Sequence, residues 1–374
     1  MVSIDPVLYI GISQSFFALI LVLTKRPLTT ANRLMATWLV LICIELIIAL
    51  LNSRVIEMYS FPFVSFTYGP LLYLYVKYMT RPDEKFSWLA LVHFVPFVVF
   101  LVVSVLFREI PLMKDLRSFF APDRFISLRI IYAVMMLLSV TGYSLMAFIL
   151  IIRHQAYLKT ILSYTSGMIT LNWLKVFSSS FYVTFLVLFI LGGLNMIGDF
   201  IPFDPYFVVF GFIMAFTFVL SFYIINQPVI YGNEVRILNG EDKKETEKYT
   251  RSGLKDAQAD EYLARIIKYV EEKRPYLDRN LSVQDLADAT DIPRHHITQV
   301  LNERHKKNFF TFINEYRVKE VIDRYKDPKN NNFTILAIAF DSGFNSKTTF
   351  NSIFKSQTGM TPSEYREKAT GIRQ

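Results

Sequence analysis

The stretch FDSGFNSKTTFNSIFKSQTGMTPSEYR, residues 340–366, decides how the C-terminal part of this 374-residue chain folds. The run ILAIAF leads into it, follows the capping residue Thr334, and predicts a short helix. The Asp-Ser-Gly sequence after this run predicts a turn. A second helix then follows, capped by Asn345 or Ser346 and with apolar residues three and four apart. The pattern therefore predicts a helix-turn-helix unit over residues 334–357.

The second helix of this unit divides its side chains between two faces. Phe350, Ile353 and Phe354 recur at helical spacing and predict the buried face. The polar residues on the opposite face are Lys347, Thr348, Asn351, Ser352 and Lys355. A second helix with a polar outer face is typical of the helix-turn-helix arrangement, in which that helix enters the DNA major groove.

A similar pattern occurs earlier, in LSVQDLADATDIPRHHITQVLNER at 281–304. Ser282 is expected to cap a first short helix, and Pro293 to occupy the first turn of a second. The second helix is predicted to bury Ile297, Val300 and Leu301. Its outward-facing residues are predicted to be Arg294, His295, Thr298, Gln299 and Asn302. Residues 282–304 thus predict a second helix-turn-helix unit, and FFTFINEYRVKEVIDRY (309–325) predicts a helix that connects the two.

Residues 281–366 resemble the AraC/XylS family of bacterial transcription regulators. The matching elements are LADATDIPRHHITQVLNE, FINEYRVKEV and ILAIAFDSGFNSKTTFNSIFKSQTGMTPSEYR, of which the last is the most distinctive. The resemblance implies a DNA-binding domain with tandem helix-turn-helix units, and the whole layout is similar to that of membrane-anchored members of the family. The first unit differs from the family at Lys306, where a glycine often ends the recognition helix.

The resemblance also implies which residues contact DNA. The base-contacting positions fall on His295, Thr298, Gln299, Lys347, Thr348 and Ser352. Their chemistry suits this role, because glutamine can bond adenine, lysine guanine, and threonine a base edge or a thymine methyl. Arg294, Asn351 and Lys355 are expected to contact phosphates, which positions a protein on DNA without specifying a sequence.

The first 228 residues are far more apolar than the rest. They carry 15 Lys+Arg and 10 Asp+Glu, whereas residues 229–374 carry 25 and 22. A bilayer-crossing helix needs roughly 20 mostly apolar residues. The segments that approach this length are 6–23, 34–51, 61–78, 89–107, 128–152, 178–198 and 205–226. A soluble core holds one or two such runs but hardly seven, so the sequence predicts a membrane bundle.

The distribution of cations predicts how this bundle is oriented. With the N-terminus outside, the cytoplasmic loops carry nine Lys and Arg and the outer side six, the bias of the positive-inside rule. No basic residue precedes the first apolar run, which favours a retained span over a signal peptide. We therefore predict an all-α protein of the cytoplasmic (inner) membrane. Its expected parts are a seven-helix transmembrane domain at 1–228, a charged cytosolic linker at 229–257 and an AraC-type DNA-binding domain at 258–374.

One acidic residue, Glu45, lies deep within a predicted span. An ionisable group there costs roughly 2.5–3.5 kcal/mol on insertion scales and is a functional hypothesis by default. His93 and Asn195 are candidate partners across the bundle. Two explanations stay open: a protonated Glu45 bonded to a neighbouring helix, or a polar site that recognises a ligand.

The remaining motifs argue against catalysis and metal binding. Cys43 is the single cysteine, so an intramolecular disulfide is impossible. His295 and His296 are adjacent on a helix, point in different directions, and have no carboxylate or cysteine pattern to complete a ligand set. HExxH, GxSxG and phosphate-binding glycine loops are lacking. We expect no metal, no cofactor and no enzymatic activity.

The sequence therefore favours a membrane-bound transcription regulator that couples a signal at the bundle to promoter binding. The expected partners are double-stranded DNA, the lipid bilayer, RNA polymerase, a second copy of the chain, and a small-molecule or protein stimulus whose identity the sequence does not reveal. The alternative is a membrane transporter or channel with a regulatory cytosolic helical domain. The scarcity of polar groups in the spans argues against that alternative.

Overall fold

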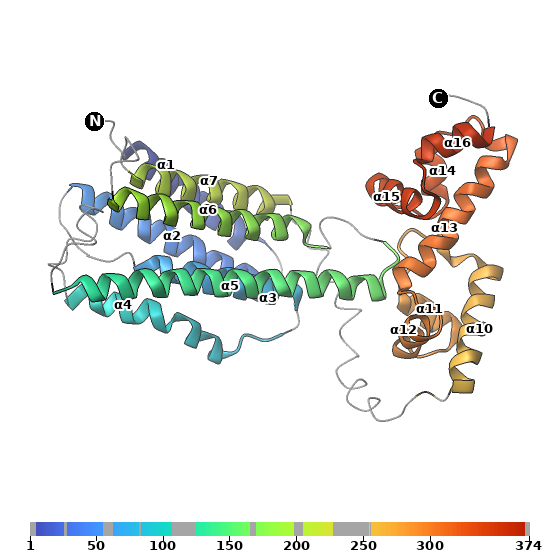
Figure 1. Ribbon diagram of the computed structural model, residues 1–374, viewed down its shortest axis with the longest axis horizontal. Helices are drawn as coiled ribbons and strands as arrows, with labels where there is room; N and C mark the ends of the chain where they lie inside the picture. Colours follow the sequence, from blue (N-terminus) through green and yellow to red (C-terminus); the bar gives the residue numbers. More distant parts are fainter. Residues whose placement is uncertain are drawn as a thin grey trace. The chain divides into compact units, whose positions relative to one another are not determined.

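The computed structural model describes residues 5–25, 28–54, 63–81, 84–106, 124–164, 170–197, 205–226, 254 and 256–370. Every regular element in these residues is a helix, which confirms the predicted all-α fold (Figure 1). The chain divides into two compact units. Unit 1 comprises Met1–Ile152 and Asn172–Asn239, and unit 2 comprises Arg153–Leu171 and Gly240–Gln374.

Unit 1 is a bundle of long helices joined by shorter ones. Its elements are α1 (Asp5–Thr24), α2 (Thr30–Arg54), the 3-10 helix η1 (Phe63–Thr67), α3 (Tyr68–Thr80), the 3-10 helix η2 (Trp88–Phe94), α4 (Val95–Leu106), most of α5 (Ile126–Ile161), α6 (Asn172–Ile197) and α7 (Pro205–Asn226). α1 packs against α2 and α7, α2 packs against α3, and α4 packs against η1. The long helices run along a common direction (Figure 1).

Aromatic side chains fill the interior of unit 1. The buried ring of Trp38 contacts the rings of Tyr68, Phe181 and Phe216 at centroid distances of 6.2, 6.4 and 5.7 Å, and so joins α2 to α3, α6 and α7. A second cluster consists of Phe66, Phe100 and Tyr132. Tilted and edge-on contacts of this kind add to the stabilisation from buried area.

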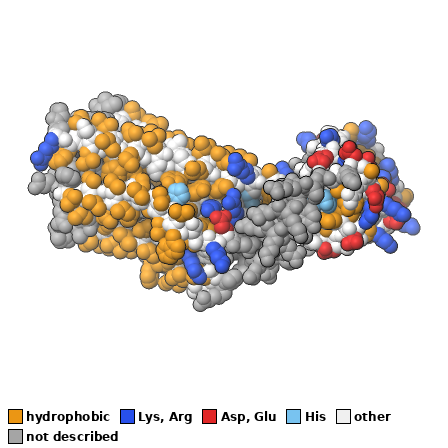
Figure 2. All heavy atoms as spheres, turned by 90° about the horizontal axis from the view of Figure 1, so that it is seen from below, with side chains coloured by type: hydrophobic (Ala, Val, Ile, Leu, Met, Phe, Trp, Pro, Cys, Tyr) orange, Lys and Arg blue, Asp and Glu red, His pale blue; other side chains and the backbone are white. Residues whose placement is uncertain are grey.

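The outer surface of unit 1 is apolar as well. On α1 the side chains of Tyr9, Ile10, Phe16 and Phe17 are each about half exposed, and Figure 2 shows hydrophobic side chains over much of one face of this unit. Large contiguous exposed apolar patches are rare on soluble monomers. A helix bundle that is hydrophobic both inside and outside is typical of a lipid environment.

Within the described residues, five helical segments are long and apolar enough to cross a membrane. They are Asp5–Thr24, Thr30–Leu51, Trp88–Leu106, Ile126–Ile161 and Asn172–Leu194, and Val208–Tyr223 is a shorter apolar stretch. The predicted span 61–78 is divided in the structure between η1 and the 13-residue α3. Pro70 explains the division, because proline is tolerated in the first turn of a helix but not in its interior. The number of membrane crossings stays a prediction.

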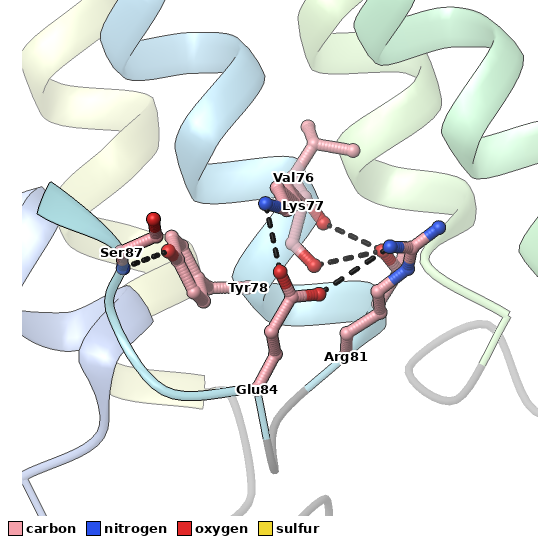
Figure 3. Close-up of polar contacts among 7 residues, drawn as sticks. Val76, Lys77, Tyr78, Arg81, Glu84 and Ser87 are labelled. Atoms are coloured by element: carbon pink, nitrogen blue, oxygen red, sulfur yellow. Dashed lines mark hydrogen bonds and ion pairs between the residues drawn. The ribbon is translucent and has the colours of Figure 1, made fainter. Parts of the chain in front are cut away.

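The loop after α3 is closed by ionic contacts (Figure 3). Lys77 Nζ lies 2.8 Å from Glu84 Oε1, and Arg81 Nη1 lies 3.3 Å from Glu84 Oε2. The Ser87 backbone N–H donates to the Tyr78 hydroxyl at 3.2 Å. These contacts return the chain from α3 to η2 and place charged groups at this end of the bundle.

Unit 2 is polar on its surface and apolar inside. Its elements are the end of α5, then α10 (Asp256–Lys273), η5 (Pro275–Leu277), α11 (Val283–Thr290), α12 (Arg294–Glu303), α13 (Phe309–Lys326), η6 (Pro328–Asn330), α14 (Ile335–Asp341), α15 (Lys347–Thr358) and α16 (Pro362–Thr370). The pairs α11–α12 and α14–α15 correspond to the predicted helix-turn-helix units. α13 contacts helices of both pairs.

The sequence-based boundaries are only partly covered by the structure. The boundary between residues 228 and 229 lies outside the described residues. α10 begins at Asp256, close to the predicted start of the DNA-binding domain. The presence of Arg153–Leu171 in unit 2 was not expected from the sequence.

Candidate DNA-binding surface

Local hydrogen bonds define both ends of α11. The Ser282 backbone N–H donates to Asp285 Oδ2 at 2.7 Å, and Ser282 Oγ accepts from the Asp285 backbone N–H at 3.3 Å. This capping box satisfies N–H groups that the helix itself leaves unpaired, and it confirms the predicted cap. α11 ends at Thr290, and the C-cap residue Asp291 has a left-handed φ of 53° and donates its backbone N–H to the Ala287 carbonyl. Pro293 then precedes α12 as its N-cap, one position before the first turn where it was expected.

The second helix pair is delimited in the same way. Thr334 Oγ1 accepts from the Ala337 backbone N–H at 3.1 Å, as predicted for the start of α14. Ser346 Oγ accepts from the Thr349 backbone N–H at 3.4 Å, so Ser346 and not Asn345 caps α15.

The apolar faces of both second helices are buried. Ile297, Val300 and Leu301 of α12 are almost fully enclosed, as predicted. On α15, Phe350 and Phe354 are fully buried and the half-buried Ile353 packs against their cluster. Each helix is therefore anchored in unit 2 by its apolar face.

α15 presents all of its predicted contact residues to solvent. Lys347, Thr348, Asn351, Ser352 and Lys355 are all exposed. Residues three and four apart share a helix face, so these side chains form one polar surface opposite Phe350 and Phe354. Two cations and three hydrogen-bonding side chains suit a groove edged by phosphates.

The corresponding residues of α12 are less accessible. Arg294, His295, Thr298 and Gln299 are each half-buried. The Thr298 hydroxyl donates to the Arg294 carbonyl at 3.2 Å, and Gln299 Nε2 lies 3.2–3.3 Å from both carboxylate oxygens of Glu303. Gln299 would have to exchange Glu303 for a base edge before it could contact DNA.

Part of this difference comes from α10, which packs against α12. The ring of Tyr262 on α10 lies 5.8 Å from that of His296, and the His295 ring lies 4.1 Å from the His296 ring. Burial, and secondarily the neighbouring His295, lower the pKa of His296 below its ordinary value, which favours the neutral form at pH 7. Within the described residues, no group of three or more His, Cys, Asp or Glu side chains is placed to hold a metal ion.

The backbone at Lys306 shows why a glycine is common at this position in the family that the chain resembles. This residue has a φ of 57°, the left-handed conformation that glycine adopts without steric cost. The chain therefore turns after α12 as a glycine would, at a cost of roughly 1–2 kcal/mol for a residue with a side chain.

A buried arginine, Arg317 on α13, organises the junction between the two helix pairs. Its side chain is 1% exposed. Nε donates to the Tyr276 carbonyl at 2.8 Å, and Nη2 donates to the Asp278 carbonyl at 2.7 Å. Burial lowers the pKa of Arg317 to about 10, so the guanidinium stays charged at neutral pH. Arg317 was not predicted from the sequence. Its place at helical spacing between the buried residues Ile313 and Val321 was the feature that could have indicated a buried cation.

The turn of the second helix pair packs onto the same place. Gly343 has a φ of 92°, and a Cβ built there would lie 2.0 Å from the Tyr276 carbonyl oxygen and 2.9 Å from Arg317 Nε. Nearby, Arg279 Nε donates to the Phe340 carbonyl at 3.0 Å. Residues 276–279, which precede α11, thus lie between α13 and the turn of the α14–α15 pair.

The predicted intramembrane polar residues have separate partners. Glu45 accepts hydrogen bonds from Ser65, at 3.1 Å, and from Tyr68. His93 Nδ1 lies 2.9 Å from the Tyr143 hydroxyl. The side chain of Asn195 lies outside the described residues. The structure therefore gives Glu45 hydroxyl partners from η1 and α3 and does not bring it together with His93.

Comparison with known proteins bears on unit 2 alone. Residues 286–368 match a protein family described as "Helix-turn-helix domain", and the matched region runs from α11 to α16. No curated protein and no solved structure is detectably similar to the chain. The match supports the resemblance to the AraC family and a role in DNA binding and transcription regulation.

Replacement of Gly343 tests the junction. Gly343→Ala is expected to lower the local unfolding free energy of unit 2 by about 3 kcal/mol, because the new methyl group meets backbone and the left-handed φ is strained. Gly359→Ala is the matched control, since Gly359 also has a positive φ but no heavy atom near its Cβ position; its expected cost is about 1 kcal/mol. Hydrogen exchange of α13 and α15 amides in the full-length chain measures both. Equal effects would contradict the close approach.

Arg317→Met is expected to destabilise unit 2 by about 3 kcal/mol, because buried carbonyl groups lose their donor. Arg324→Met on the same helix is the control, since Arg324 pairs with Glu320 nearer the surface and such pairs contribute about 0–1 kcal/mol. Hydrogen exchange of the α13 amides reports the difference. A loss for Arg317→Met no larger than for the control would show that the buried arginine does not stabilise the junction.

Proposed function

We propose that the chain is a membrane-bound, sequence-specific DNA-binding transcription regulator that couples a signal at unit 1 to promoter binding by unit 2. The observation that carries the proposal is the helix-turn-helix match over residues 286–368 together with the exposed polar face of α15. A match to a DNA-binding domain also agrees with a protein that is not an enzyme.

In this proposal the two helix pairs read DNA in tandem. Lys347, Thr348 and Ser352 contact bases from α15, while Asn351 and Lys355 contact phosphates. On α12 the base contacts come from His295, Thr298 and Gln299, with Arg294 on a phosphate. Two recognition helices held on one connecting helix suit adjacent major-groove segments, about one DNA turn (~34 Å) apart.

The membrane part of the proposal rests on the five helices in the described part of the chain that are long and apolar enough to span a bilayer and on the apolar outer surface of unit 1. We place unit 1 in the cytoplasmic membrane with the N-terminus outside, and unit 2 in the cytoplasm where DNA is accessible. A stimulus changes promoter binding only if its affinity differs between two states of the protein. RNA polymerase and a second copy of the chain are the proposed protein partners.

The two lysines of α15 separate base recognition from phosphate binding. Lys347→Ala is expected to reduce discrimination between promoter and unrelated DNA by about 1–3 kcal/mol, since it removes a base contact. Lys355→Ala is expected to weaken binding to all sequences alike. It is also expected to reduce the slope of the logarithm of the binding constant against the logarithm of the salt concentration by about 1. Binding of the full-length chain in lipid nanodiscs to a captured promoter fragment, at several salt concentrations, measures both. Equal and sequence-independent losses would refute the assigned roles.

The proposed orientation is tested by reporters fused after the last residue of the chain. A reporter active only in the cytoplasm is expected to be active there, and one active only outside the membrane is expected to be silent. The reverse result would place unit 2 away from DNA and would rule out the proposed function. A reporter inserted at the N-terminus, expected outside, provides the internal control.

A further inference from the structure

The three residues after α5 are buried in unit 2. Leu162, Ser163 and Tyr164 are 4%, 0% and 6% exposed, although they precede the DNA-binding residues by more than a hundred positions. We call Leu162–Tyr164 the docking segment. α5 begins in unit 1 and ends in unit 2, so this segment is the direct continuation of a proposed membrane helix.

The docking segment pairs with the backbone that leads into the first helix pair. Leu162 and Ser282 form an isolated antiparallel bridge. The Ser163 backbone N–H donates to the Leu281 carbonyl at 3.2 Å, and the Ser163 hydroxyl donates to the same carbonyl at 2.5 Å. The segment therefore contacts the residue that caps α11.

Side chains of α13 bind the docking segment from the other side. The Ser163 carbonyl accepts from Asn314 Nδ2 at 2.9 Å and from Arg317 Nη1 at 2.7 Å. Ser163 Oγ accepts from Arg317 Nη2 at 2.9 Å. Hydrogen bonds from a charged donor are stronger than neutral ones. The backbone N–H, the carbonyl and the hydroxyl of Ser163 are thus all hydrogen-bonded, with the hydroxyl acting as donor and acceptor.

These contacts meet where the two helix pairs are joined. The guanidinium that binds Ser163 also binds the carbonyls of Tyr276 and Asp278 and lies against Gly343. Departure of the docking segment would leave donors of Asn314 and Arg317 without these carbonyl and hydroxyl acceptors. Buried donors without partners are costly, so occupation of this place by Ser163 stabilises the arrangement of the junction.

We propose that Leu162–Tyr164 fastens the cytoplasmic end of α5 to the DNA-binding unit and holds the two helix pairs in a single arrangement. The proposal rests on the proposed function and adds a route by which α5 acts on DNA binding in addition to the chain that follows α7. Pre-organised binding surfaces lose less freedom on association. Release of the docking segment therefore weakens promoter binding.

Disulfide trapping tests the docking without any DNA. In a Cys43→Ser chain, Leu162→Cys and Ser282→Cys place two thiols on bridge partners, whose Cα atoms are about 4.5–5.5 Å apart in antiparallel pairs, within the ~4.4–6.8 Å that a disulfide spans. The full-length chain in lipid nanodiscs is expected to cross-link under mild oxidation. Leu162→Cys with Asp288→Cys, on the exposed side of α11, is the control and is expected to stay reduced. Equal cross-linking of both pairs, or of neither, overturns the docking.

A second pair of variants tests what docking does. Ser163→Trp cannot fit a fully buried site and is expected to abolish the cross-link, whereas Ala156→Trp, at an exposed position on α5, is expected to preserve it. Asn314→Leu removes one donor to Ser163 from the opposite side and is expected to slow cross-linking. In the chain without added cysteines, Ser163→Trp is expected to weaken promoter binding about tenfold relative to Ala156→Trp.

The outcomes distinguish this inference from the proposed function. Cross-linking without any sequence-specific DNA binding by the wild-type chain would retain the docking and refute the proposed function. Specific DNA binding without cross-linking would retain the function and refute the docking. Cross-linking that is lost in Ser163→Trp with promoter binding unchanged would refute the effect of docking on the recognition helices.

Discussion

The arrangement of unit 2 depends on one buried cation. Arg317 is buried, and its guanidinium donates to the carbonyls of Tyr276, Asp278 and Ser163. Burial of a charge is costly unless its hydrogen bonds are replaced, and a planar group with five N–H donors can satisfy several carbonyl groups at once. The absence of a side chain at Gly343 lets the second helix pair approach the same place. The two helix pairs meet at this junction.

The two units distribute their apolar side chains differently. Unit 2 buries its apolar residues and exposes charges, as expected in water. Unit 1 packs aromatic residues inside and also exposes apolar side chains. An apolar outer surface of this kind is compatible with a lipid environment, and it is the physical argument for the proposed membrane location. Glu45 accepts a hydrogen bond from Tyr68 within the bundle, as a polar group in the proposed membrane location would need, because lipid offers no hydrogen-bond partner.

The two recognition helices are not equivalent. The candidate contact residues of α15 are all exposed, whereas those of α12 are half-buried and partly engaged by Glu303 and by neighbouring rings. In the proposed function, α15 meets DNA as it stands, while α12 first exchanges partners. This difference makes the second helix pair the stronger source of specificity in the proposed function, and it makes any element that adjusts the first pair a means of regulation.

The sequence by itself determined the local features. Ser282 and Thr334 were predicted to cap helices because their hydroxyls lie next to the N–H groups they satisfy, and the buried faces of α12 and α15 follow from helical spacing. For α15 the sequence offered Asn345 or Ser346, and only the structure identified Ser346 as the cap. Residue order cannot reveal which distant group meets Arg317, how much of α12 is covered by α10, or that Ser163 pairs with Leu281, 118 residues further along the chain. Such contacts have no periodicity along the chain. They arise only when helices pack, because a buried donor donates to whichever carbonyl oxygen the tertiary structure brings within reach.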